Sequence, residues 1–124
     1  MKPEFLSAVV DTLLPGDDAL PTGTNAGVTA KLVEHLSSTA TRDRDAYLAV
    51  LHAIAEKAGG EDVFALADEA TRIAVIETVE KEMAGAFRSL TSLLLADYYE
   101  ADSVLIAMGW RVEPPQPQGH SLPS

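Results

Sequence analysis

The sequence contains no cysteine in its 124 residues. Disulfide bonds, thiolate nucleophiles, cysteine-bound iron–sulfur clusters and haem attachment through Cys-x-x-Cys-His are therefore excluded. This absence is compatible with the cytosol and with an oxidising compartment, so it does not locate the protein. Uninterrupted apolar runs of membrane-spanning length, about 20 residues, are also missing, and we expect no transmembrane helix.

Basic side chains are scarce. Nine Lys and Arg face 19 Asp and Glu, which gives a formal net charge of −10. The basic residues are scattered, and Arg42 and Arg44 alternate with Asp43 and Asp45. Because phosphate backbones and anionic lipid surfaces repel such a chain, we expect neither nucleic acid nor direct membrane insertion.

Several functional motifs are lacking as well. There is no Gly-x-Ser-x-Gly elbow, no Gly-x-Gly-x-x-Gly and no Gly-Lys-Ser/Thr loop, so neither hydrolytic nor nucleotide chemistry is signalled. The first 14 residues mix polar and apolar side chains rather than forming the basic and apolar regions of a secretory leader. The chain as given is thus expected to be cytoplasmic, or periplasmic if it is exported with a partner or after removal of a leader.

What the sequence does contain is helical periodicity. The spacing predicts one all-α domain over residues 1–110, a bundle of five helices plus a short sixth, with no alternating β pattern. The expected ranges are Pro3–Leu13, Ala26–Ser37, Arg42–Ala58, Glu69–Lys81 and Met83–Glu100, then Ser103–Met108. Expected helix caps are Thr24 or Asn25, Thr41 and Asp68, with a short turn after Asp62.

The stretch from Met83 to Tyr98 carries the strongest pattern. Apolar residues recur at three- and four-residue steps, and Leu93 and Leu95 add apolar surface off that face, which predicts a central helix. The residues of the expected buried face are Met83, Phe87, Leu90, Leu94 and Tyr98. In the other helices Val33 and Ile73 are among the residues expected to point inward.

Residues 111–124 form a proline-rich segment with Pro114, Pro115, Pro117 and Pro123. Such spacing predicts an extended, polyproline-like tail that cannot add a helix to the bundle. It would either extend into solvent or lie along a partner.

Acid–base and metal chemistry find little support. His35, His52 and His120 are the only side chains with an unperturbed pKa near neutrality. His52 and Glu56 have the four-residue spacing of metal ligands, but no second such pair exists, so a solvated surface pair is favoured. The numerous carboxylates fall at turns and polar faces, where solvation is the simpler interpretation. We therefore predict no catalytic residue, no cofactor site and no metal site in this chain.

Tyr98, Tyr99 and Trp110 stand beside the proline-rich tail. Core packing would explain one tyrosine, but Tyr and Trp are also preferred anchors of protein interfaces. The connection from Pro15 through Pro21 to Asn25 is long for a small bundle, and long ordered loops are often functional. Both regions are therefore candidate contact surfaces.

The chain resembles the small subunit, "subunit 3", of membrane-associated gluconate 2-dehydrogenase. The residues that carry the resemblance are Leu13-Leu14-Pro15-Gly16-Asp17, Gly27-Val28, Phe87, Tyr98-Tyr99, Val104, Gly109-Trp110 and Pro117-Gln118-Gly119. The resemblance implies an accessory subunit that pairs with a large FAD-bearing dehydrogenase of the glucose–methanol–choline type and supports its maturation. It also implies, in several systems, a cytochrome subunit that carries the electrons onward.

Such small subunits often bring a twin-arginine leader, which this sequence lacks, and that departure puts an export role in doubt. The residues expected to contact the large subunit are Pro15, Gly16, Asp17, Tyr98, Tyr99, Trp110, Pro114, Pro115, Pro117 and Gly119. Two alternatives stay open: a stand-alone enzyme that uses His52 and carboxylates, and a free-standing helical interaction module, for example a homodimer, without a dehydrogenase partner.

Overall fold

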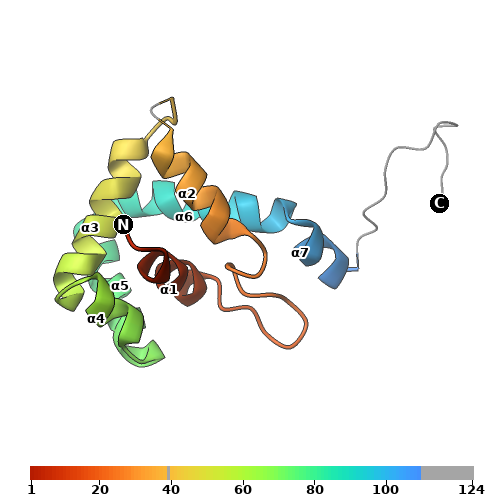
Figure 1. Cartoon of the computed structure of the whole chain (residues 1–124), viewed down its shortest axis with the longest axis horizontal. Helices are drawn as coiled ribbons and strands as arrows, with labels where there is room; N and C mark the ends of the chain where they lie inside the picture. The colour runs from red at the N-terminus through yellow and green to blue at the C-terminus, as the bar shows by residue number, and fades with distance from the viewer. Residues whose placement is uncertain (39, 110–124) are drawn as a thin grey trace, which may run out of the picture.

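The computed structural model describes residues 1–38 and 40–109. In these residues the chain forms seven α-helices and no strand, which confirms the predicted all-α class (Figure 1). The helices are α1 (Pro3–Leu13), α2 (Val28–Ser37), α3 (Arg44–Ala58), α4 (Glu61–Leu66), α5 (Glu69–Glu82), α6 (Ala84–Glu100) and α7 (Asp102–Ala107). The additional helix is α4, which lies where the sequence predicted only a short turn. Trp110 and the predicted tail at 111–124 lie outside the described residues.

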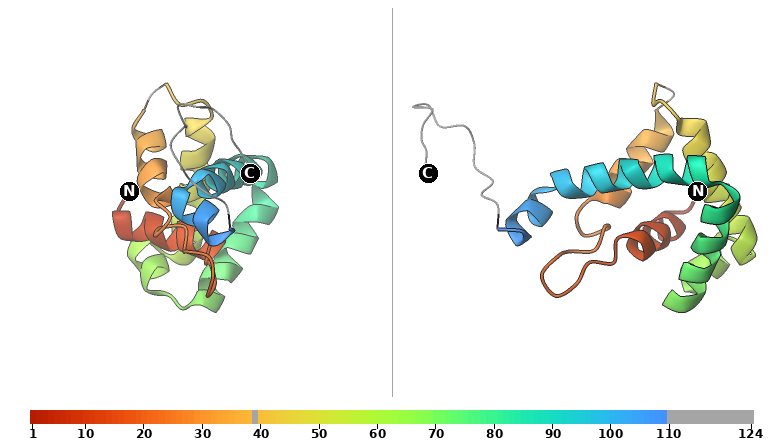
Figure 2. Two further views of the ribbon diagram at one scale, coloured as in Figure 1. Left: turned by 90° about the vertical axis from the view of Figure 1, so that its right-hand side faces the viewer. Right: turned by 180° about the vertical axis from the view of Figure 1, so that it is seen from behind.

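The core lies where α3 meets its neighbours. α3 packs against α2, α4, α5 and α6, and α1 packs against α2, α4 and α5. In the view from behind, α6 runs along the molecule and ends at α7, while α4 and α5 lie at the opposite end (Figure 2). The largest fully buried side chains are Phe5, Leu32, Leu51, Ile54, Phe64, Leu90 and Leu94.

The predicted buried face of residues 83–98 is confirmed with one adjustment. Phe87, Leu90, Leu94 and Tyr98 are buried. Met83 is only partly buried. Its non-helical backbone (φ −133°, ψ 47°) separates α5 from α6, so the helix begins at Ala84. This helix contributes one face to the core rather than being enclosed on several sides, as shown by the exposure of Leu95.

Two of the predicted helix starts were wrong for the same reason. α2 begins after Gly27 (φ 89°) and α3 after Asp43 (φ 64°), and neither helix has a side-chain cap, so Thr24, Asn25 and Thr41 do not cap. The chain enters each helix from a left-handed residue, whereas a capping side chain normally comes from a residue in the extended conformation. The predicted cap at Asp68 is confirmed, because its Oδ1 accepts a hydrogen bond from the Thr71 amide at 2.8 Å.

The inward orientation expected for Val33 and Ile73 was also wrong, since both are exposed. α2 buries Val28, Thr29 and Leu32, and α5 buries only Ile76 and Val79, because peripheral helices bury the narrow stripe that faces a neighbour. Among the described residues, no helix is long and apolar enough to span a bilayer.

Arg72 joins α5 to α4. Its Nε donates a hydrogen bond to the Phe64 carbonyl at 3.1 Å, and its Nη2 donates to the Ala65 carbonyl. The guanidinium carbon lies 5.9 Å from the centroid of the Phe64 ring. Arg72 therefore adds a second hydrogen bond to the Phe64 carbonyl, which already accepts from the Ala67 amide at 3.2 Å, and pairs the Ala65 carbonyl at the end of α4.

Candidate functional site

The loop between α1 and α2 is tied at its base to the helix that precedes it. The Gly23 amide donates to the Leu14 carbonyl at 2.8 Å, and the Thr24 amide donates to Asp11 Oδ1 at 2.8 Å. Gly23 is buried, and a Cβ there would lie 2.5 Å from Val10 Cγ1. The loop therefore packs directly onto α1, at a distance that only glycine allows.

The tip of this loop is closed by Asp17. Its Oδ1 accepts hydrogen bonds from the amides of Ala19 at 2.7 Å and Leu20 at 2.8 Å, and its own amide donates to the Leu20 carbonyl at 3.0 Å. The hydrogen bonds from the backbone amides of Leu20 and, to a smaller extent, Ala19 hold the pKa of Asp17 below its usual range. Because the folded-state pKa is lowered, the turn is stabilised above the usual carboxyl pKa and loses that stabilisation as the pH falls through the lowered value.

Gly16 adopts φ 66°, in the left-handed region, and a Cβ there would lie 2.5 Å from the carbonyl oxygens of Leu20 and Pro21. The Pro-Gly-Asp sequence thus meets two requirements of one turn. Glycine avoids the collision, and the aspartate carboxylate satisfies the amides.

Tyr98 anchors the loop from α6. Its hydroxyl donates a hydrogen bond to the Pro21 carbonyl at 2.7 Å, and its side chain is only 4% exposed. Burial raises the pKa of Tyr98, with smaller contributions from Tyr99 and Asp17, so the neutral hydroxyl is the form that the folded chain favours. Tyr98 therefore holds the loop in place, whereas the exposed tyrosine at this end is the next residue, Tyr99.

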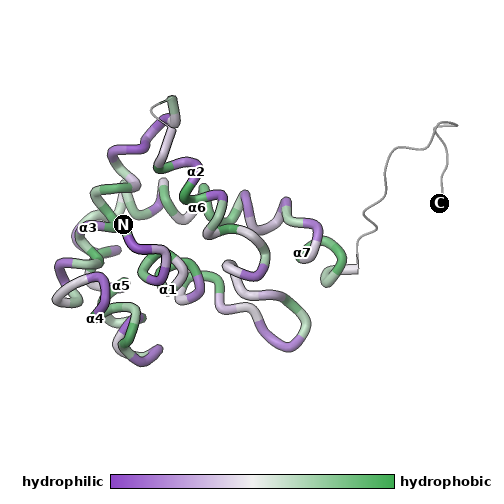
Figure 3. Tube along the Cα trace, viewed as in Figure 1, coloured by the Kyte–Doolittle hydropathy of each residue, from purple (hydrophilic) through white to green (hydrophobic). Residues whose placement is uncertain are grey.

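Tyr99 packs edge-on against Tyr98, with ring centroids 5.3 Å apart, and remains 50% exposed. Other exposed apolar side chains lie near it along the chain: Leu95 one turn earlier on α6, and Ile106 and Met108 in and after α7. Figure 3 shows apolar segments on α7 and on the loop that faces it. We call the loop at 14–27, the α6 residues from Thr91 onward and α7 together the loop end.

The structure thus gathers Pro15, Gly16, Asp17, Tyr98 and Tyr99 at the loop end (Figure 1). The other residues predicted to bind a partner, Trp110, Pro114, Pro115, Pro117 and Gly119, lie outside the described residues. The sequence interpretation missed a small apolar pocket of about 130 Å³ lined by Leu13, Leu14, Thr91, Leu94 and Leu95. Its only sequence signal was the run of leucines at 93–95, which extends past a single helix face.

Comparison with protein families gives one decisive result. The family model for gluconate 2-dehydrogenase subunit 3 matches residues 2–112. The chain belongs to this family. The match includes every residue of the loop end, whereas Pro117-Gln118-Gly119, which also carried the resemblance, lies beyond it. Comparison with curated proteins and with solved structures gives no match.

In this subunit 3 chain the histidines of the described residues lie apart from the loop tip. His52 and Glu56 are both exposed and border a shallow depression beside Gly59 and Gly60. His35 on α2 instead approaches Asp97 on α6, with 3.2 Å between Nε2 and Oδ2. Across residues 1–38 and 40–109, no three His, Asp or Glu side chains are placed to hold a metal ion together. His120 lies outside the described residues.

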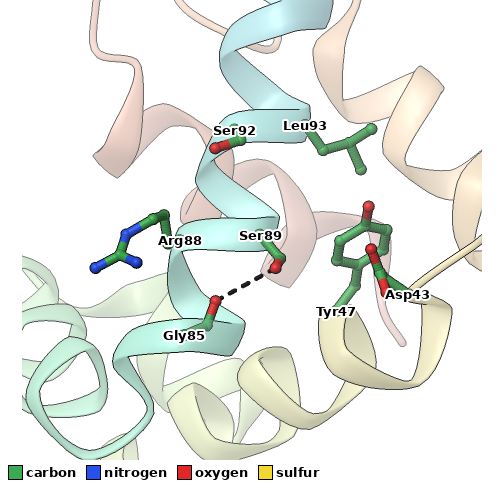
Figure 4. A pocket seen from close by; sticks show the side chains of 7 residues that line it. All are labelled: Asp43, Tyr47, Gly85, Arg88, Ser89, Ser92 and Leu93. Atoms are coloured by element: carbon green, nitrogen blue, oxygen red, sulfur yellow. Dashed lines mark hydrogen bonds between the residues drawn. The ribbon is translucent and has the colours of Figure 1, made fainter.

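A shallow groove of about 510 Å³ lies between the start of α3 and α6 (Figure 4). Its lining residues are Asp43, Tyr47, Gly85, Arg88, Ser89, Ser92 and Leu93. Ser89 donates its hydroxyl to the Gly85 carbonyl at 3.3 Å, and Arg88 points away from Asp43 in Figure 4. No histidine is among the residues that line this groove.

Proposed function

We propose that this chain is a non-catalytic accessory subunit of a sugar or sugar-acid dehydrogenase. In this proposal it binds a large FAD-dependent subunit of the glucose–methanol–choline type and supports that subunit's maturation. The observation that carries the proposal is the family match over residues 2–112, because the family is named for a subunit of a dehydrogenase complex. FAD, and in some complexes a cytochrome, would reside in other subunits.

The loop end supports this role by its construction. Its loop is fixed at Leu14, Asp17 and Pro21 by backbone and side-chain hydrogen bonds, so its surface is ordered before any partner arrives. Ordering a surface in advance lowers the entropy cost of association. Tyr99 and Ile106 then present apolar area without being needed to hold the loop. We place the contact with the large subunit here, together with Trp110 and the tail through Gly119.

The test is co-expression of this chain with a large FAD-dependent dehydrogenase subunit from the same genome, followed by copurification and by measurement of FAD content and dehydrogenase activity. We expect the large subunit to be recovered with bound FAD only in the presence of this chain. Tyr99→Ala is expected to weaken copurification, whereas Leu66→Ala, an exposed apolar residue on α4, is the matched control and is expected to have no effect. Deletion of residues 111–124 is expected to weaken it too.

Three results would contradict the proposal. The large subunit could mature and act equally well without this chain. The purified chain could oxidise a sugar by itself, which would support a stand-alone enzyme. Finally, it could form a stable homodimer that ignores the flavoprotein, which would favour the free-standing interaction module.

A further inference from the structure

The apolar pocket at the loop end has the size of a single side chain. It lies between the end of α1 and the second half of α6 and has a volume of about 130 Å³. An apolar cavity of roughly 150 Å³ is enough to hold a benzene molecule, so this pocket accommodates one aliphatic or phenyl group. Of its lining residues, only Thr91 carries a polar side-chain atom, and its hydroxyl already donates to the Arg88 carbonyl at 3.1 Å.

The loop at 14–27 and the chain from Ser89 to Gly109 carry formal charges of one sign. Residues 14–27 and 89–109 contain five acidic side chains and no Lys or Arg; the five are Asp17, Asp18, Asp97, Glu100 and Asp102. Asp97 Oδ2 lies 3.2 Å from His35 Nε2 on α2. The nearest base on the same helix is the exposed Arg88, which lies three residues or about 4.5 Å along the helix axis before Thr91 and seven residues or about 10 Å before Leu95. The opposite end of the molecule mixes signs, with Lys57 beside Glu82 and Arg72 on α5.

We propose that the pocket receives one apolar side chain of the large dehydrogenase subunit, carried on a segment flanked by Lys or Arg. This inference rests on the proposed function and specifies its contact. An anchor side chain that fills a desolvated pocket supplies most of the binding energy of many interfaces. The surrounding carboxylates select a basic partner and accelerate its approach. A second copy of this chain would bring acidic residues against acidic residues, which disfavours it as the occupant.

The direct test fills the pocket in the chain and measures the dissociation constant of the reassembled complex. Thr91→Phe adds a ring at the pocket rim. Thr78→Phe is the matched control, because Thr78 lies on α5 and its hydroxyl donates to the Ala74 carbonyl in the same way. We expect Thr91→Phe to raise the dissociation constant at least about tenfold and Thr78→Phe to change it less than about twofold. Leu95→Ala, which removes one wall of the pocket at a half-exposed position, is expected to raise it about three- to tenfold.

The charge requirement has its own test. Asp18→Lys combined with Glu100→Lys reverses two exposed acids at the loop end, and Glu77→Lys with Glu80→Lys makes the same charge change on exposed positions of α5. The first pair is expected to slow association with the large subunit by about tenfold or more at low salt, and the second pair by much less. The difference between the pairs is expected to shrink as salt is added.

The outcomes separate this inference from the proposed function. If the unmodified chain does not associate with the flavoprotein, the proposed function itself fails. If it associates and Thr91→Phe and Leu95→Ala both bind like the unmodified chain, the pocket assignment fails and the accessory role stands. The assignment also fails if Thr91→Phe disperses a homodimer of the isolated chain. It fails equally if the effect of Thr91→Phe disappears when residues 110–124 are deleted, because the chain would then fill its own pocket.

Discussion

The end of the molecule built from α3, α4 and α5 differs from the loop end in what holds it together. At the first, Phe64 is fully buried and meets Phe5 edge-on, with ring centroids 5.7 Å apart. At the second, a loop of 14 residues packs Leu14, Leu20 and Ala26 against the core and is also fixed by hydrogen bonds that involve Asp17, Gly23 and Tyr98. The first end is stabilised by burial of aromatic rings, and the second adds directed hydrogen bonds to its packing.

This difference has a functional consequence. Apolar burial is non-directional and is shared among many contacts, so it stabilises a fold without fixing any one surface atom. Hydrogen bonds at fixed angles place a loop in one conformation and leave its outer surface available. The loop end can therefore present exposed residues such as Tyr99 in a constant position, which is what recognition of a partner requires.

The largest expected effect lies at the buried end. Phe64→Ala is expected to lower the free energy of unfolding by about 3–5 kcal/mol, because it removes a fully buried ring and leaves a cavity. Leu66→Ala, two residues later on α4 and 87% exposed, is expected to change it by less than about 0.5 kcal/mol. Urea denaturation followed by circular dichroism measures both. Similar losses for the two variants would show that burial does not govern this end.

An intermediate effect is expected at the loop turn. Gly16→Ala is expected to cost roughly 2–3 kcal/mol, since it combines a positive φ with a collision against two carbonyl oxygens. Gly27→Ala has a similar positive φ but open space around the added Cβ, so about 1 kcal/mol is expected. Hydrogen exchange at the Leu20 and Gly23 amides should rise in the first variant before the core opens. If exchange in the core rises equally, the loop is not a separate unit of stability.

The same contrast explains what the sequence predicted. The buried face of α6 follows from periodicity, because burial selects residue types at helical spacing. The starts of α2 and α3 were not predicted, since these helices begin after Gly27 and Asp43 in left-handed conformations and without a side-chain cap. Helix α4 was taken for a turn because its six residues are too few to show a period.

The candidate site was predictable in its parts but not in its arrangement. The Pro15–Asp17 turn and the Tyr98–Tyr99 pair were chosen as partner contacts from the resemblance and from residue type. They lie at one end of the molecule, and their contact with a partner stays a prediction. The sequence could not predict that Tyr98 would hold the loop while Tyr99 stays exposed, because the hydrogen bond from Tyr98 to Pro21 spans 77 positions of the chain. The pocket beside Leu95 is formed by residues of α1 and α6 together, and no local sequence pattern predicts that these two helices lie side by side there.

The smallest expected effect isolates that long-range hydrogen bond. Tyr98→Phe keeps the buried ring and removes only the hydroxyl that donates to Pro21, so a loss of about 1 kcal/mol in unfolding free energy is expected. Tyr99→Phe, whose ring is half exposed, is expected to be neutral within about 0.5 kcal/mol.

The pH dependence of the unfolding free energy, compared between the unmodified chain and Tyr98→Phe, provides a second measurement of the hydrogen bond from Tyr98 to Pro21. Because burial raises the pKa of Tyr98, its stabilising contribution is complete below the ordinary tyrosine pKa of about 10 and is lost as the pH rises through the raised value. The unmodified chain should therefore lose more stability than Tyr98→Phe between about pH 9 and pH 11, and the gap between them should close. A gap that stays constant over this range would show that the hydroxyl does not hold the loop, and the loop end would then depend on packing like the rest of the molecule.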